Sequence, residues 1–205
     1  MANGTAQQKA ATSNTVALDS HALGTLKYIR ASIDAAGLLA VPGSAGIVMG
    51  AVGLAAATLV SLPAFSPHWF RVWLVAGVTA AACGTGLILH QAGVRGTALY
   101  RGPVRKFLLC LCPALAAGMV LTWVLWRHGV AELIPGTWLL LYGCGVAAAG
   151  TMTVRAVSIM GALFLALGLA ALLLPATLGN VLLGAGFGGL HMIFGIIIRW
   201  TTHEH

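Results

Sequence analysis

His191 is the residue of this sequence most able to do chemistry inside a membrane. It lies between Gly188 and Gly195 in a long apolar segment, and no Asp, Glu, Lys or Arg accompanies it at that depth. An ionisable side chain at membrane depth is expected to face another helix and often marks a functional site. The position also fits a structural role, in which a neutral imidazole bonds to a hydroxyl group such as that of Thr151 or Thr153. Both roles stay open at this point.

The cysteines are a second set of candidate residues. Cys83, Cys110 and Cys112 are predicted at a similar depth, near His90, and thiolates with an imidazole can bind Cu(I) or Zn(II). However, Cys110 and Cys112 are two residues apart, so on a regular helix they point about 200° apart. Free cysteine in apolar helices is often a small filler residue. We therefore predict no cofactor, and this metal site remains an alternative.

Carboxylates are scarce and peripheral. The four acidic residues are Asp19, Asp34, Glu132 and Glu204, and all lie outside the apolar segments. Reactions that need a carboxylate pair, and ion transport coupled to a carboxylate, are therefore disfavoured. We also find no metalloprotease, serine-hydrolase or nucleotide-binding motif, so we predict that the protein is not an enzyme.

Composition indicates the elements that carry these residues. The chain is 59% hydrophobic and 7% charged, whereas soluble domains are about 25% charged. The apolar segments are of the length that crosses about 30 Å of hydrocarbon as a helix. The predicted spans are residues 44–62, 69–89, 107–126, 137–154, 156–174 and 178–198. The predicted fold class is an all-α membrane protein with six transmembrane helices in hairpin pairs.

The remaining segments complete the predicted organisation. Residues 1–18 are small and polar and are expected to form a disordered cytoplasmic tail. Residues 19–41 are expected to form an amphipathic helix that lies in the membrane interface. Residues 42–200 make up the six-helix transmembrane domain, and residues 201–205 a cytoplasmic tail.

The cations predict the orientation of the chain. With cytoplasmic termini, the outer loops carry only Arg71 and Arg127, and the other nine of the eleven cations lie inside. We therefore expect a multi-pass protein of the bacterial inner (cytoplasmic) membrane. No basic run with interleaved aromatic residues favours nucleic acid. Candidates for contact with lipid headgroups or a partner are Lys27, Arg30, Arg95, Arg101, Arg105 and Lys106.

Glycines supply the most regular pattern. They recur at steps of three and four residues, and such stripes let helices approach closely in lipid. The predicted packing residues are Gly46, Gly50 and Gly53 in the first span and Gly184, Gly188 and Gly195 in the sixth.

The sequence also contains an internal repeat and two resemblances. Residues 49–64 and 160–176 both begin Met-Gly-Ala and end Leu-Pro-Ala, which suggests a duplicated hairpin. The small residues, outer proline and glycine-rich return of residues 160–198 resemble HdeD-type acid-resistance membrane proteins of bacteria. The whole stretch from residues 28–31 (Tyr-Ile-Arg-Ala) to residues 186–195, which is most of the chain, also resembles a set of bacterial multi-pass inner-membrane proteins with no assigned activity. Neither resemblance implies a catalytic residue.

Two functions are compatible with these features. The first is a non-enzymatic scaffold or accessory subunit that associates with itself or with a membrane partner through glycine-lined helix faces. The second is a transporter or channel for a small uncharged solute, with His191 in the pathway. The second function predicts a hydrated cavity that reaches His191.

Overall fold

The structure is a computed structural model that describes residues 25, 26, 28, 42–94, 103–151 and 155–203. The chain divides into two units, Met1–Leu38 and Leu39–His205. In the first unit Thr25, Leu26 and Tyr28 are helical, and the rest of the predicted interfacial helix lies outside the described residues.

The described part of the second unit is built from helices, without strands. Five of the six predicted spans form single helices, which are α2 (Gly43–Ser61), α3 (Trp69–Val94), α4 (Pro103–Arg127), α5 (Ile134–Gly150) and α6 (Arg155–Leu173). The sixth span consists of α7 (Gly179–Leu183), the π-helical segment η4 (Gly184–Leu190) and α8 (His191–His203). The described residues thus contain six helical segments long and apolar enough to cross a membrane, which confirms the predicted membrane-embedded helical class.

Proline residues explain several helix ends. Pro42 precedes α2 and Pro175 precedes the short 3-10 turn η3 (Ala176–Leu178), because proline lacks an N–H and restricts the residue before it. Pro135 lies in the first turn of α5, where a missing N–H costs nothing. The 3-10 turns η1 (Ser66–His68) and η2 (Ala131–Leu133) make the remaining connections at this end of the bundle.

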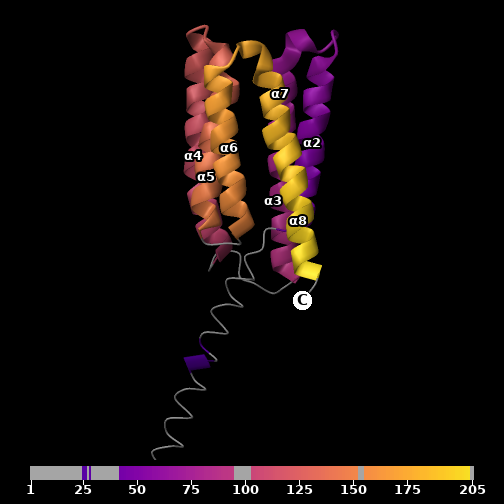
Figure 1. The fold of residues 1–205 in the computed structure, drawn as a ribbon, viewed down its shortest axis with the longest axis vertical. Helices are drawn as coiled ribbons and strands as arrows, with labels where there is room; N and C mark the ends of the chain where they lie inside the picture. The colour runs from indigo at the N-terminus through magenta and orange to yellow at the C-terminus, as the bar shows by residue number, and fades with distance from the viewer. Residues whose placement is uncertain (1–24, 27, 29–41, 95–102, 152–154, 204–205) are drawn as a thin grey trace, which may run out of the picture. The chain divides into compact units, whose positions relative to one another are not determined.

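The helices form two groups (Figure 1). In the first group, α2 packs against α3 on one side and against η4 and α8 on the other. In the second group, α5 packs against α6 and α4. The surface where α5 and α6 meet α7, η4 and α8 is called the junction below. The last two spans are therefore not a closely packed hairpin, because α6 packs mainly on α5 and η4–α8 mainly on α2.

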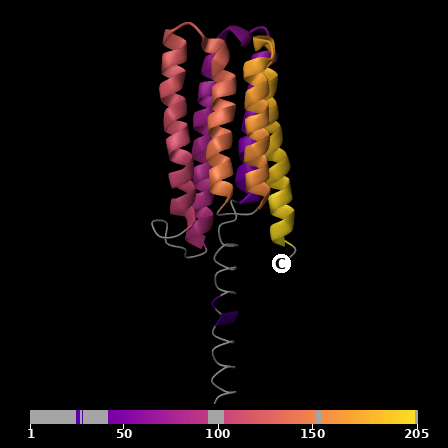
Figure 2. The same ribbon diagram turned by 60° about the vertical axis from the view of Figure 1, so that its left-hand side comes forward.

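The helices run side by side along one axis (Figure 2), and they differ in how much of their surface the bundle covers. In the apolar stretch of α5 56% of the residues are buried inside the bundle, against 11% in α3 and 6% in α4. The core lies along the junction, with Leu139, Tyr142, Phe164, Leu183 and Phe194 among its buried members. We call α3 and α4 the edge helices, and α2, α5, α6 and the sixth span the central helices.

Candidate functional site

His191 lies at the junction and is paired with a tyrosine. Its side chain is 3% exposed, and its Nε2 atom lies 2.7 Å from the hydroxyl oxygen of Tyr142 on α5. The prediction that Thr151 bonds to His191 was wrong, because the hydroxyl group of Thr151 donates to the carbonyl oxygen of Ala148, at the end of the same helix, at 2.7 Å. Thr153 lies outside the described residues. The imidazole thus joins the two helix groups by a hydrogen bond.

Two phenylalanine rings enclose this pair. Phe164 of α6 lies 4.9 Å from the Tyr142 ring and 5.4 Å from the His191 ring, measured between centroids. Phe187 of η4 lies 5.0 Å from Tyr142 and is nearly parallel to the imidazole, at 6.1 Å and 14°. Offset and edge-to-face contacts of this kind add stability beyond the area they bury. The centre of the junction is therefore a layer of four packed rings.

The surroundings of the second imidazole nitrogen bear on whether the His191 ring could carry a charge. His191 Nδ1 is buried and has no hydrogen-bond partner of good geometry among the described residues, although backbone groups of Gly186 and Phe187 lie near the ring. The one described carboxylate, Glu132, is on an exposed turn at the end of the bundle. A charged imidazole would therefore have no acidic counter-charge nearby, which disfavours a proton relay and favours a neutral ring that holds the groups together.

Tyr142 is the site residue that sequence reasoning missed. Tyrosine in membrane proteins is usually found near the interface, where its hydroxyl reaches water. Tyr142 instead lies in the middle of α5 and is 8% exposed. A tyrosine at that depth must find a hydrogen-bond partner inside the protein, and this requirement was a signal for a pair with His191.

The π-helical segment η4 packs closely on helices of both groups because it consists mostly of glycine. A Cβ on Gly186 would lie 2.5 Å from Leu139 of α5, and one on Gly184 would lie 2.7 Å from Ala57 of α2. One side of η4 therefore packs closely on α5, and the opposite side packs closely on α2. π-Helical turns are rare and are frequently found at functional sites, and this one carries Phe187 and leads directly into His191.

The predicted packing glycines meet one another within the chain. A Cβ on Gly50 would lie 2.6 Å from the backbone nitrogen of Met192, and one on Gly53 would lie 2.5 Å from the carbonyl oxygen of Phe187. Gly46 packs against Gly195 in the same way, and Gly188 against Leu54. These six glycines thus fit α2 to the sixth span, so their faces are already occupied inside one molecule.

Asn180 of α7 fastens one end of the first group. Its Nδ2 group donates to the carbonyl oxygen of Ala57 at 3.0 Å and to the hydroxyl oxygen of Ser61 at 3.3 Å. Its Oδ1 atom accepts a hydrogen bond of 3.0 Å from the indole N–H of Trp73. One amide side chain therefore joins α7 to both α2 and α3.

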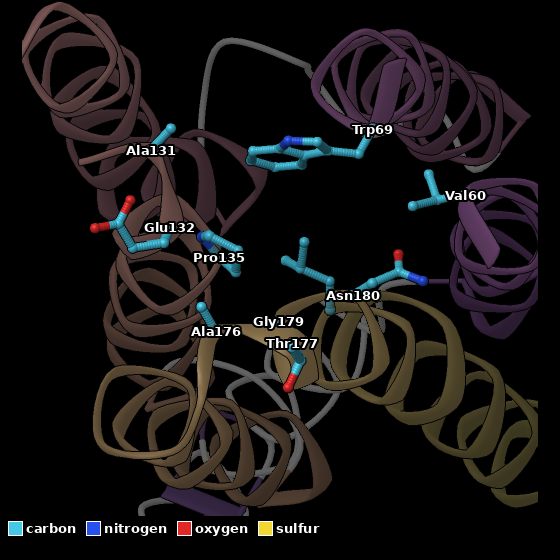
Figure 3. A pocket seen from close by; sticks show the side chains of 10 residues that line it. Val60, Trp69, Ala131, Glu132, Pro135, Ala176, Thr177, Gly179 and Asn180 are labelled. Atoms are coloured by element: carbon cyan, nitrogen blue, oxygen red, sulfur yellow. The ribbon is translucent and has the colours of Figure 1, made fainter. Parts of the chain in front are cut away.

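A cavity of about 390 Å³ opens at this end of the junction (Figure 3). Its walls come from both helix groups and from the turns between them. They consist of Val60, Trp69, Ala131, Glu132, Pro135, Ala176, Thr177, Gly179, Asn180 and Leu183. His191 is not among these residues, so the cavity does not reach the ring layer as the solute-pathway hypothesis predicted.

The metal site that was considered as an alternative is not assembled among the described residues. Cys83 and His90 are on α3, whereas Cys110 and Cys112 are on α4, and the two edge helices pack on different central helices. Within the described residues no three His, Cys, Asp or Glu side chains lie close enough together to hold a metal ion. Cys83 and Cys112 are exposed on the outside of their helices.

The basic residues proposed for headgroup contact are only partly covered by the structure. Arg105 is exposed in the first turn of α4, and Lys106 follows it in the same helix. Lys27, Arg30, Arg95 and Arg101 lie outside the described residues.

Comparison with known proteins assigns no family to this arrangement. No protein-family model matches the chain, and no curated protein or solved structure matches it. The resemblance to HdeD-type proteins therefore stays a prediction, and the chemistry of the site has to be argued from its own residues.

Proposed function

We propose that the protein is a non-enzymatic membrane scaffold or accessory subunit that associates side by side through the outer face of α3. The observation that carries this proposal is the open space around glycines of that helix, of which Gly86 and Gly93 share the outer face while Gly77 points to the opposite side. A Cβ added to Gly77, Gly86 or Gly93 would have no neighbouring atom within 4 Å. The glycines first expected to serve association are used internally, so the surface for a partner moves to the edge of the bundle.

The residues around Gly86 suit a helix–helix contact in lipid. Ala82 and Gly86 are both exposed and lie four residues apart, which gives the small-xxx-small spacing that lets two helices approach closely. Gly93 follows seven residues later on the same face. A flat face of small residues is complementary to a copy of itself across a two-fold axis. We therefore expect the first partner of this face to be a second copy of the chain.

The membrane and the orientation are part of the same proposal. Helix order places Arg105, Arg155 and Arg199 at one end of the bundle and Arg71 and Arg127 at the other. The first end would be cytoplasmic in a bacterial inner membrane, because most of the described cations lie there. The guanidinium group of Arg127 lies 5.4 Å from the ring centre of Trp123 at the opposite end, a pairing that suits the outer interface.

The test is the oligomeric state of the purified chain in lipid nanodiscs and in mild detergent, measured by native mass spectrometry. We expect a dimer, and we expect Gly86→Leu to weaken dimerisation at least about tenfold, because a branched side chain separates the helices. Ala166→Leu, on the exposed face of α6, is the matched control and should leave the dimer intact. A monomer at all protein concentrations, or equal behaviour of both variants, would contradict the proposal.

A solute pathway along the junction is the second candidate function. It is supported by the cavity, which opens onto the same junction that contains His191 deeper in the bundle. The four-ring layer would have to separate before a solute could pass. In a cysteine-free background, a pathway predicts that Leu183→Cys and Phe187→Cys both react with a water-soluble thiol reagent. Reaction at residue 183 alone would show that the layer stays closed and would exclude this function.

A further inference from the structure

We propose that the cavity at the end of the junction is a binding site for a small, uncharged aromatic molecule. This inference is independent of association through α3, because the cavity lies between the helix groups and α3 contributes only Trp69 to its wall. Its volume of about 390 Å³ falls within the range of pockets that hold small ligands.

Apolar groups supply most of the surface that a ligand would touch. Val60, Pro135 and Leu183 are buried residues from three different helices, and they form the inner walls. The indole ring of Trp69 extends across the space from α3 (Figure 3). A large flat ring beside aliphatic walls favours an aromatic ligand, which can stack on the indole.

The polar groups of the lining offer little stabilisation to a charged ligand. The carboxylate of Glu132 points away from the space that the other side chains surround (Figure 3), and its residue is exposed. The amide of Asn180 is already engaged by Ala57, Ser61 and Trp73. The lining contains no Lys, Arg or His. An ion would therefore lose hydration without gaining a counter-charge from these groups.

The aromatic wall is braced before any ligand arrives. The ring of Trp69 meets Phe70 edge to face at 5.8 Å, and Phe70 stacks on Trp126 of α4 at 4.6 Å. This row of rings extends from α3 to α4 at the same end of the bundle. A wall held in place in this way loses little conformational freedom on binding, which favours affinity.

The test uses fluorine NMR of the full chain in nanodiscs, with its six tryptophans replaced by 5-fluorotryptophan. The probe is benzyl alcohol, and benzoate and benzylammonium are its charged counterparts. We expect a saturable shift of the Trp69 resonance with benzyl alcohol and an affinity at least about tenfold weaker for either ion. The resonance of Trp200, in the last helix, reports partition of the probe into lipid.

Two filling variants locate the site. Ala131→Leu on η2 and Ala176→Leu on η3 each add a branched side chain to the lining and should weaken binding at least about tenfold. Ala166→Leu is the control and should bind as the unaltered protein does. The proposal is overturned by parallel, non-saturating shifts of Trp69 and Trp200, by equal binding of benzoate, or by filling variants that fold and still bind. Native mass spectra of the same samples report self-association separately, so failure of either proposal is visible alone.

Discussion

The consecutive helices α2 and α3 are both rich in glycine, yet most of their glycines have opposite surroundings; the exception in α3 is Gly84, which packs against Met49 of α2. In α2, the space beside Gly50 and Gly53 is occupied by the backbone of the sixth span. In α3, the space beside Gly77, Gly86 and Gly93 is open. The first helix belongs to the centre of the bundle and the second to its edge.

This difference shows that the position of a helix decides what its glycines do. α2 has neighbours on two sides, so a missing side chain becomes a close helix–helix contact. α3 packs mainly on α2 and leaves most of its surface outside the bundle. Gly77, Gly86 and Gly93 therefore contribute little to the fold of one molecule and remain available to another.

The largest effect is expected at the centre. Gly50→Ala places a methyl group 2.6 Å from the backbone nitrogen of Met192 and 2.9 Å from the carbonyl oxygen of Gly188. Backbone atoms cannot rotate away, so α2 and the sixth span must separate. We expect the free energy of unfolding, measured by denaturant titration in detergent, to fall by about 1–3 kcal/mol. Unchanged stability would remove the contrast between centre and edge.

The polar contact at the centre predicts a somewhat smaller loss. Tyr142→Phe keeps the packed ring but leaves Nε2 of His191 buried without its partner. The expected destabilisation in the same titration is about 1–2 kcal/mol. The double variant Tyr142→Phe/His191→Leu should lose less stability than the sum of the losses of the two single variants, because it removes the unpaired nitrogen. Strict additivity of the two changes would show that the pair does not link the groups.

At the edge, association should weaken while folding does not. Gly86→Leu meets open space within one molecule, and leucine is a better helix former than glycine, so the unfolding free energy should stay the same or rise by up to about 1 kcal/mol. Its dimerisation should weaken at least about tenfold, as measured by energy transfer between labelled chains in liposomes. A large loss of stability in this variant would place α3 at the centre of the fold instead.

Much of the helical architecture could be predicted from local sequence. Apolar length identified the helices, and Pro42 and Pro175 lie next to helix ends, because both signals act within a few residues. The glycine pattern also identified helix faces able to pack closely. It could not distinguish an internal partner from an external one, since that depends on which helices become neighbours.

The candidate site was harder to predict from the sequence for the same reason. Tyr142 and His191 are 49 residues apart, and no sequence pattern around either residue indicates that the other is its partner. The π-helical turns of η4 depend on both helix groups fitting around glycines, which is a property of the assembled bundle. The proposed metal cluster assumed that α3 and α4 were neighbours at the depth of Cys83 and Cys110, whereas each edge helix packs on a different central helix.

The most direct test compares one substitution at two matched positions, Gly50→Ala in α2 and Gly77→Ala in α3. Both glycines lie inside a helix, and alanine is the better helix former by about 0.5–1 kcal/mol. At Gly77 the added methyl group has no neighbour within 4 Å, so the unfolding free energy should rise by up to that amount. At Gly50 the backbone clash dominates, so the unfolding free energy should fall. Opposite signs, measured by denaturant titration under monomeric conditions, are the predicted result, and the same sign at both positions would contradict the account.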